Sequence, residues 1–228
     1  PRAPIEDEPV YEGNLEEAIV YVRVPRTIGR HQVELKNDEP YTLHSPDVWD
    51  RLPDSRHVFE GFNAPGQLIY RDADGGERIL YDCVLRNDPC VPLDPMVSFD
   101  GRRILFSVYW GKRLKNASWD GTTLPNRWLD QATEARLHVV DIATGKVTPL
   151  KHEAGVFDVS PAWLPDGRIL FASSRARFRE PWLDGITPNR RVETQLYIAD
   201  EQGGNAVNIS PHEVTTAMHP YVLRNGRI

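Results

Sequence analysis

The sequence predicts an all-β protein, a partial β-propeller of about three four-stranded blades with long inserts between the second and third strands of each blade. Two short patterns each recur three times in the same order, and this repetition carries the prediction. The 19 Pro and 16 Gly are also spread along the whole chain, which leaves few stretches able to form a long helix.

The first pattern is an apolar strand that begins with Leu, reaches an Asp four positions later and a Gly eight positions later. Its copies run from Leu68 to Gly76, from Leu137 to Gly145 and from Leu196 to Gly204. An Asp at a turn hydrogen-bonds nearby backbone N–H groups through its carboxylate. We therefore expect Asp72, Asp141 and Asp200 to cap their turns.

The second pattern is a Pro, a short strand, a turn Gly six positions after the Pro, and an Arg. Its copies run from Pro95 to Arg102, from Pro161 to Arg168 and from Pro220 to Arg227. Each turn Gly follows Asp or Asn, the residue pair that tight hairpins prefer because it tolerates positive φ. A second strand follows at residues 104–107 and 169–172, and an equivalent strand at residues 19–22 begins the first unit.

Together the two patterns describe a four-stranded meander that repeats every 59 to 69 residues, with 59 from Gly167 to Gly226 and 69 from Gly76 to Gly145. Such units bury their faces by stacking radially on like neighbours. A β-sandwich of hairpins is the less favoured alternative, because a sandwich does not require the same hairpin chemistry at a fixed period.

The expected division follows from this period. It comprises an N-terminal extension (1–17), a first blade (18–82) with a long insert (27–67), a second blade (83–150) with an insert (111–135), a third blade (151–210) with an insert (176–195) and the truncated start of a fourth (211–228). Three units cannot complete a ring. We therefore expect the remaining propeller blades to come from further polypeptide or from a partner chain.

Two segments resemble a known repeat. Residues 160–171 (SPAWLPDGRILF) and 196–200 (LYIAD) are similar to the repeat of TolB-type, WD40-like (PD40) propellers. In more detail, residues 94–101 (DPMVSFDG), the pair His219-Pro220 and the long inserts resemble the propeller region of hydrazine synthase α subunit-like proteins. That resemblance implies a secreted or periplasmic redox protein whose propeller accompanies c-type haem domains. This chain has no Cys-x-x-Cys-His, so no covalent haem can be attached to it.

The composition of the chain limits the classes of partner that we expect. A net charge of −6 and a pI near 5.7 provide no basic field for a phosphate backbone, so we expect no nucleic-acid partner. The longest apolar runs, such as residues 18–22, are far shorter than the roughly 20 residues of a membrane span. Cys83 and Cys90 enclose six residues and could form a disulfide, remain as free thiols or ligate a metal.

Two inserts repeat a Trp, an Asp-Gly pair and a Pro-Asn-Arg run. Because strand direction alternates in a meander, the inserts should lie on the same face as the links between blades, opposite the hairpin glycines. The residues could simply form turns with each Trp over its own blade edge, or they could form a face for a protein partner or ligand. The candidates for that face are Trp119, Asp120, Arg127, Trp128, Trp182, Asp184 and Arg190.

A second set of candidates lies in the links between blades. Cys83, His152 and His212 fall fifteen or sixteen residues after the repeated Leu, and Glu153 and Glu213 follow the two histidines. Cys, His and carboxylate side chains suit zinc or another transition metal, so these five residues are candidate ligands of a divalent metal. The alternative is a set of solvated turns.

No Gly-rich phosphate loop and no Gly-x-Ser-x-Gly nucleophile elbow occurs, and no catalytic residue is predicted. The first hypothesis is a non-catalytic scaffold or binding segment of a secreted or periplasmic protein resembling the hydrazine synthase α subunit. Two alternatives stay open. One is part of a metal- or haem-dependent periplasmic oxidoreductase whose redox centres lie elsewhere, and the other is a TolB-like envelope module that binds proteins.

Overall fold

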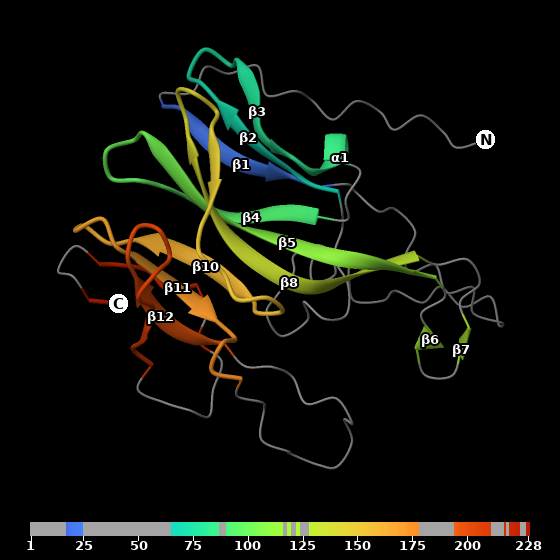
Figure 1. Ribbon diagram of the computed structural model, residues 1–228. Coiled ribbons are helices and arrows are strands. Elements are labelled where there is room, and N and C mark those ends of the chain that lie inside the picture. The colour runs from blue at the N-terminus through green and yellow to red at the C-terminus, as the bar shows by residue number, and fades with distance from the viewer. Residues whose placement is uncertain are drawn as a thin grey trace, which may run out of the picture.

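Antiparallel strands make up nearly all of the regular structure in the computed structural model (Figure 1). The structure describes residues 17–24, 65–86, 90–115, 118–119, 122–123, 128–177, 194–210, 217, 219–223 and 227–228. Of residues 86, 112–115, 118–119, 122–123 and 128–132 it describes only the backbone. These residues form three meander sheets and one small hairpin. The chain is all-β and has the architecture of a partial β-propeller.

The first sheet has three described strands in chain order. They are β1 (Ile19–Arg23), β2 (Gln67–Arg71) and β3 (Glu77–Asp82), and a single helical turn, α1 (Cys83–Arg86), follows them. Among the described residues, this sheet therefore has one strand fewer than each of the two sheets that follow.

The second and third sheets each have four strands in chain order. The second contains β4 (Cys90–Val97), β5 (Arg103–Lys115), β8 (Trp128–Asp141) and β9 (Val147–Pro149). The third contains β10 (Asp158–Trp163), β11 (Ile169–Ser173), β12 (Gln195–Ala199) and β13 (Val207–Asn208). β6 (Ser118–Trp119) and β7 (Thr122–Thr123) pair with each other.

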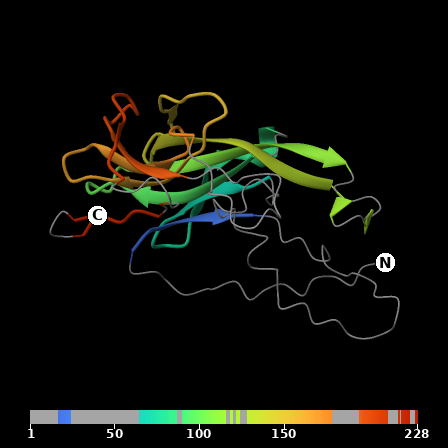
Figure 2. The same ribbon diagram turned by 90° about the horizontal axis from the view of Figure 1, so that it is seen from below.

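The sheets follow one another in space as they do in sequence, with the second sheet between the first and the third (Figures 1 and 2). The turns that join β2 to β3, β4 to β5 and β10 to β11 all lie at the same end of the sheets (Figure 1). The links between sheets lie at the opposite end, because each sheet is an antiparallel meander. We call these the hairpin end and the link end.

Apolar side chains fill the space between neighbouring sheets. Between the first and second sheets, Leu68 and Tyr81 pack with Phe106 and Val108, and all four are buried. Strand alternation sends these side chains to the facing surfaces. Burying a side chain of this size stabilises the fold by about 1.5–3 kcal/mol relative to leaving it exposed.

The second and third sheets meet around Trp163. This residue is 1% exposed and packs in one cluster with Leu105, Leu137 and Phe171. Its indole N–H donates to the carbonyl of Met96 at 3.2 Å, so the buried ring leaves no polar atom unpaired. Trp163 is therefore one of the buried side chains that join the third sheet to the second.

The turn chemistry expected of the repeated Asp is confirmed. The carboxylates of Asp72 and Asp200 accept the backbone N–H groups of Gly76 and Gly204, each at 2.7 Å, and Asp141 accepts the N–H three positions further on at 2.8 Å. A Cβ on Gly76 would lie 2.6 Å from the Asp72 carboxylate. Glycine is required there because the carboxylate approaches the backbone so closely.

The second sheet extends further than the sequence suggests. β5 and β8 continue into the segment expected as an insert, residues 111–135, and pair from Gly111 with Ala132 to Lys115 with Trp128 after a register shift at Trp110. The result is a two-stranded ribbon that projects from the link end (Figure 1). Across the described part of the chain, no helix combines the length and apolar character needed to cross a bilayer.

Candidate functional sites

The two cysteines form a disulfide that closes the first link between sheets. Cys83 and Cys90 have Cα atoms 5.6 Å apart, and both residues are fully buried. A disulfide sulfur carries no thiolate charge, and the thiolate is the form of cysteine that ligates metals. In this state Cys83 is therefore not available to the metal site that its sequence position suggested.

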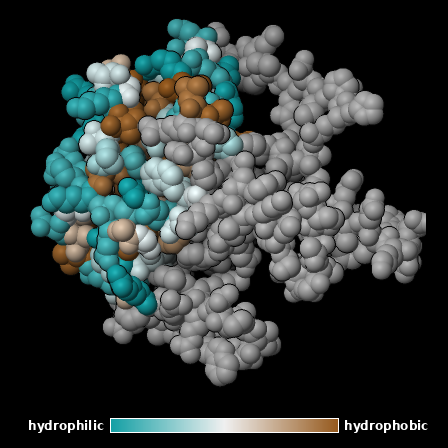
Figure 3. All heavy atoms as spheres, turned by 45° about the vertical axis from the view of Figure 1, so that its right-hand side comes forward, coloured by the Kyte–Doolittle hydropathy of each residue, from teal (hydrophilic) through white to brown (hydrophobic). Residues whose placement is uncertain are grey.

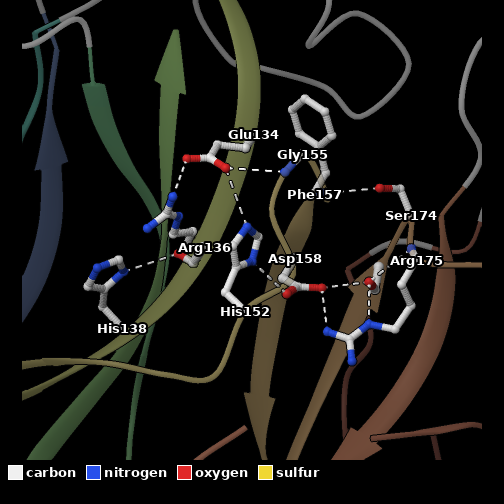
Figure 4. Close-up of polar contacts among 10 residues, drawn as sticks. Glu134, Arg136, His138, His152, Gly155, Phe157, Asp158, Ser174 and Arg175 are labelled. Atoms are coloured by element: carbon white, nitrogen blue, oxygen red, sulfur yellow. Dashed lines mark hydrogen bonds and ion pairs between the residues drawn. The ribbon is translucent and has the colours of Figure 1, made fainter.

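His152 lies between two carboxylates that come from neighbouring sheets (Figure 4). Its Nδ1 is 3.1 Å from Asp158 of β10, and its Nε2 is 3.6 Å from Glu134 of β8. The side chain is only 7% exposed. We call Glu134, His152, Asp158, Ser173 and Arg175 the seam, because together they join the second sheet to the third.

Asp158 is the centre of the seam and is 2% exposed. Besides His152 it accepts the Ser173 hydroxyl at 2.5 Å and an Arg175 N–H at 2.8 Å. A buried carboxylate is stable only when charged and neutral donors replace the water it has lost. Here three donors do so, and they lie on the link, on β11 and just after β11.

Glu134 completes the seam on the other side of the imidazole. It pairs with Arg136 at 2.6 Å and accepts the backbone N–H of Gly155 at 3.3 Å (Figure 4). Partial burial raises the pKa of the Glu134 carboxyl, but the hydrogen bonds from Gly155 and Arg136 outweigh it, and the net pKa is lowered. The seam therefore holds its two carboxylates in place with fixed donors.

The residue after His152 points to a different partner. Glu153 pairs with Arg177 at 2.8 Å, and both side chains are exposed. His212 and Glu213 lie outside the described residues. Within the described ranges no group of three or more His, Cys, Asp or Glu side chains is placed to hold a metal ion, in the links or elsewhere. The structure thus does not bring Cys83, His152 and Glu153 together.

The candidates on the insert face fall almost wholly outside the described residues. Trp119 belongs to β6 and Trp128 begins β8, and for both only the backbone is described. The other five lie outside the described ranges: Asp120, Arg127, Trp182, Asp184 and Arg190.

A further cluster joins the second sheet, the third sheet and the segment after the third. The Ser160 hydroxyl lies 3.3 Å from a carboxylate oxygen of Asp94 and 3.3 Å from Nδ1 of His219. Asp94 lies on β4 and Ser160 on β10, the first strands of their sheets, which in a propeller lie nearest the axis. We call Asp94, Ser160 and His219 the axial cluster.

All three residues of the axial cluster have a left-handed backbone. Their φ angles are 51°, 50° and 47°, and each residue directly precedes the Pro of the repeated hairpin pattern. Residues before Pro usually take extended conformations, and a non-Gly residue with such a φ costs roughly 1–3 kcal/mol. The strain therefore recurs at the same position of three successive units.

The strain coincides with interruptions in the strand pairing. The register of β4 on β5 shifts between Leu93 and Met96, and that of β10 on β11 shifts between Val159 and Ala162. A β-bulge of this kind turns a side chain out of the regular alternation of the strand. The bulges thus account for how Asp94 and Ser160, on different sheets, come within hydrogen-bonding distance.

The carboxyl group of Asp94 has an unusual environment. Burial raises its pKa above the ordinary value, although the nearby His219 and the hydrogen bonds from Ser160 act in the opposite direction. A charged group kept where its charge is disfavoured is typical of binding and catalytic sites more than of structural ones. Sequence reasoning missed the cluster, and its signal was the polar residue before each repeated Pro.

Comparison with known proteins adds little to this description. No protein-family model matches the chain, and no curated protein does. Among solved structures, the chain is similar to the crystal structure of the tricorn protease, with 18% sequence identity and a TM-score of 0.37. The match covers 59% of this chain and 11% of the tricorn protease chain, so this chain spans about a tenth of that protein's length. The fold assignment rests on the three sheets themselves.

Proposed function

We propose that this chain is the scaffolding and binding segment of a β-propeller, and that its link end receives a protein partner. The observation that carries the proposal is the ribbon. β5 has 13 residues and β8 has 14, whereas β11 and β12, which hold the equivalent places in the third sheet, have five each. A projecting ribbon adds surface without adding to the packing between sheets, as suits a contact with another molecule (Figure 1).

The partner we propose is protein, either the remaining propeller blades or a separate chain. Exposed apolar side chains on the described surface support this. Val207 of β13 is 61% exposed, and Ile79, Val84 and Leu85 of the first sheet and α1 are exposed as well. Figure 3 shows apolar side chains gathered in the upper part of the described surface, next to hydrophilic ones. Exposed apolar side chains favour protein contacts, and the net charge of −6 disfavours nucleic acid.

The compartment we propose is the periplasm or the exterior of the cell. The Cys83–Cys90 disulfide supports it, because disulfides persist in oxidising compartments and are rare in the cytosol. The sequence resemblance to hydrazine synthase α subunit-like proteins makes a periplasmic redox complex the context we propose first, and a TolB-like envelope assembly the second.

Site-specific photo-crosslinking in the native host tests the proposal. A photoreactive amino acid is placed on the ribbon at Lys112 or its partner Gln131 and, as matched controls, at the hairpin end at Asp100 or Asp166. We expect one defined crosslinked species from the ribbon positions and none from the hairpin positions. Equal crosslinking from both ends, or none from the ribbon, would contradict a partner at the link end.

A further inference from the structure

We propose that the axial cluster binds a divalent transition metal ion, with the Asp94 carboxylate and the His219 imidazole as ligands and the Ser160 hydroxyl beside them. This site is separate from the partner face proposed above. It also differs from the candidate ligands in the links, because it is built from the first strands of successive units.

The residue types suit the ion. Zinc and its first-row neighbours bind imidazole nitrogen and carboxylate oxygen, and water fills the positions that the protein leaves open. The histidine side chain is exposed, so an ion can reach it from solvent, whereas Asp94 is partly buried.

The spacing within the cluster is compatible with a shared metal ion. The Ser160 hydroxyl lies 3.3 Å from a carboxylate oxygen of Asp94 and 3.3 Å from Nδ1 of His219, and both contacts are longer than the roughly 2.7–2.9 Å of strong hydrogen bonds. Neighbouring ligands of a tetrahedral ion with bonds of about 2.0–2.1 Å are about 3.3 Å apart. An ion bound by the cluster would therefore require little movement of the Ser160 hydroxyl relative to its two neighbours.

The backbone supplies an independent argument. A bulge with a purely structural role makes no demand on its side chain, yet here three strained positions from three successive units direct polar side chains to one place. Backbone strain of this kind persists where the surrounding structure over-determines it, commonly at ligand-binding sites. A bound ion would connect three units that share no hydrogen-bond ladder.

Isothermal titration of the metal-free protein with Zn²⁺ and with Mn²⁺ tests the proposal. We expect one ion per chain in the wild type and at least a tenfold weaker affinity in Asp94→Asn and in His219→Ala. Asp166→Asn is the matched control, because it removes an exposed carboxylate that pairs with Arg168 outside the cluster. We expect its affinity to stay within twofold of the wild type.

Two outcomes would overturn the site. The first is no binding of either ion by the wild type. The second is binding that Asp94→Asn and His219→Ala leave unchanged, which would place the ion elsewhere. Co²⁺ loading gives a second readout, since the visible absorption bands of a nitrogen-ligated ion should change in His219→Ala. Circular dichroism of each variant shows whether the sheets remain folded, so that a loss of binding is not mistaken for a loss of fold.

Discussion

Asp158 and Ser160 lie two residues apart on β10, yet they belong to regions of opposite character. Asp158 is the centre of the seam, where His152, Ser173 and Arg175 all donate to its carboxylate. Ser160 is the centre of the axial cluster, where the backbone is left-handed and the contacts are long. One strand therefore supplies both a well-satisfied structural network and a strained polar cluster.

The contrast between the seam and the axial cluster distinguishes residues that stabilise the fold from residues that we assign to function. A buried charged network contributes to a specific fold when every member has a partner, and the loss of one partner is costly. The axial cluster has the reverse properties, since its strain and the unfavourable burial of Asp94 oppose folding. Groups that oppose folding and still meet in one place are best explained by a ligand.

The largest expected effect is a difference in stability between variants of Asp158 and of Asp94. Asp158→Asn should destabilise the protein by about 3–5 kcal/mol, because it leaves Arg175 without its buried counter-charge and disrupts the contact with His152. Asp94→Asn, measured without metal, should change stability by less than about 1 kcal/mol, because it removes a charge that burial disfavours. Urea unfolding followed by circular dichroism measures both. Equal losses in the two variants would contradict the distinction.

A smaller difference in stability is expected between variants of Ser173 and of Ser160. Ser173→Ala should cost about 1–3 kcal/mol, because the hydroxyl is fully buried and bonds both Asp158 and Arg175. Ser160→Gly should leave stability within about 1 kcal/mol of the wild type, because glycine relieves the left-handed φ while adding freedom to the unfolded chain. Thermal unfolding of the metal-free variants checks this. A loss above 2 kcal/mol in Ser160→Gly would show that the axial position is structural.

The smallest effect is a difference in pH dependence. The pKa of Asp94 is raised above its ordinary 3.8, so its contribution to stability is present at low pH and is lost as pH rises through the folded-state pKa. The pKa of Glu134 is lowered from 4.5, so its contribution is present above that value and is lost as pH falls.

The free energy of unfolding is measured between about pH 3 and pH 7 for the metal-free wild type, Asp94→Asn and Glu134→Gln. This comparison shows whether the two carboxyl groups change stability with pH in opposite directions. With rising pH the wild type should lose stability relative to Asp94→Asn and gain it relative to Glu134→Gln. Parallel pH profiles for the two variants would be inconsistent with opposite environments.

Much of the fold could be predicted because it depends on interactions between residues that are close together in the sequence. The repeated Leu lies in β2, β8 and β12, and Asp100-Gly101 and Asp166-Gly167 form hairpin turns with positive φ at the glycine. Turn residues and strand alternation act over a few positions, so the sequence displays them directly. The length of the β5–β8 ribbon depends on pairing between segments far apart in the chain, and it was not predicted.

The sites were harder to predict because they depend on which units meet. His152 and Glu153 are adjacent in sequence and were interpreted as a pair of ligands, but one faces Asp158 and the other Arg177. The axial cluster was missed for the opposite reason. Its members are about sixty residues apart and differ in type, so no single motif contains them, and only the left-handed turn before each repeated Pro brings them together.

Anomalous diffraction from crystals of this chain grown with Zn²⁺ would locate an ion at the axial cluster without the need for any variant. We expect one strong anomalous peak bounded by the Asp94 carboxylate, the Ser160 hydroxyl and the His219 imidazole. A peak at His152 instead, or an axial cluster without a peak in crystals that hold zinc elsewhere, would contradict it.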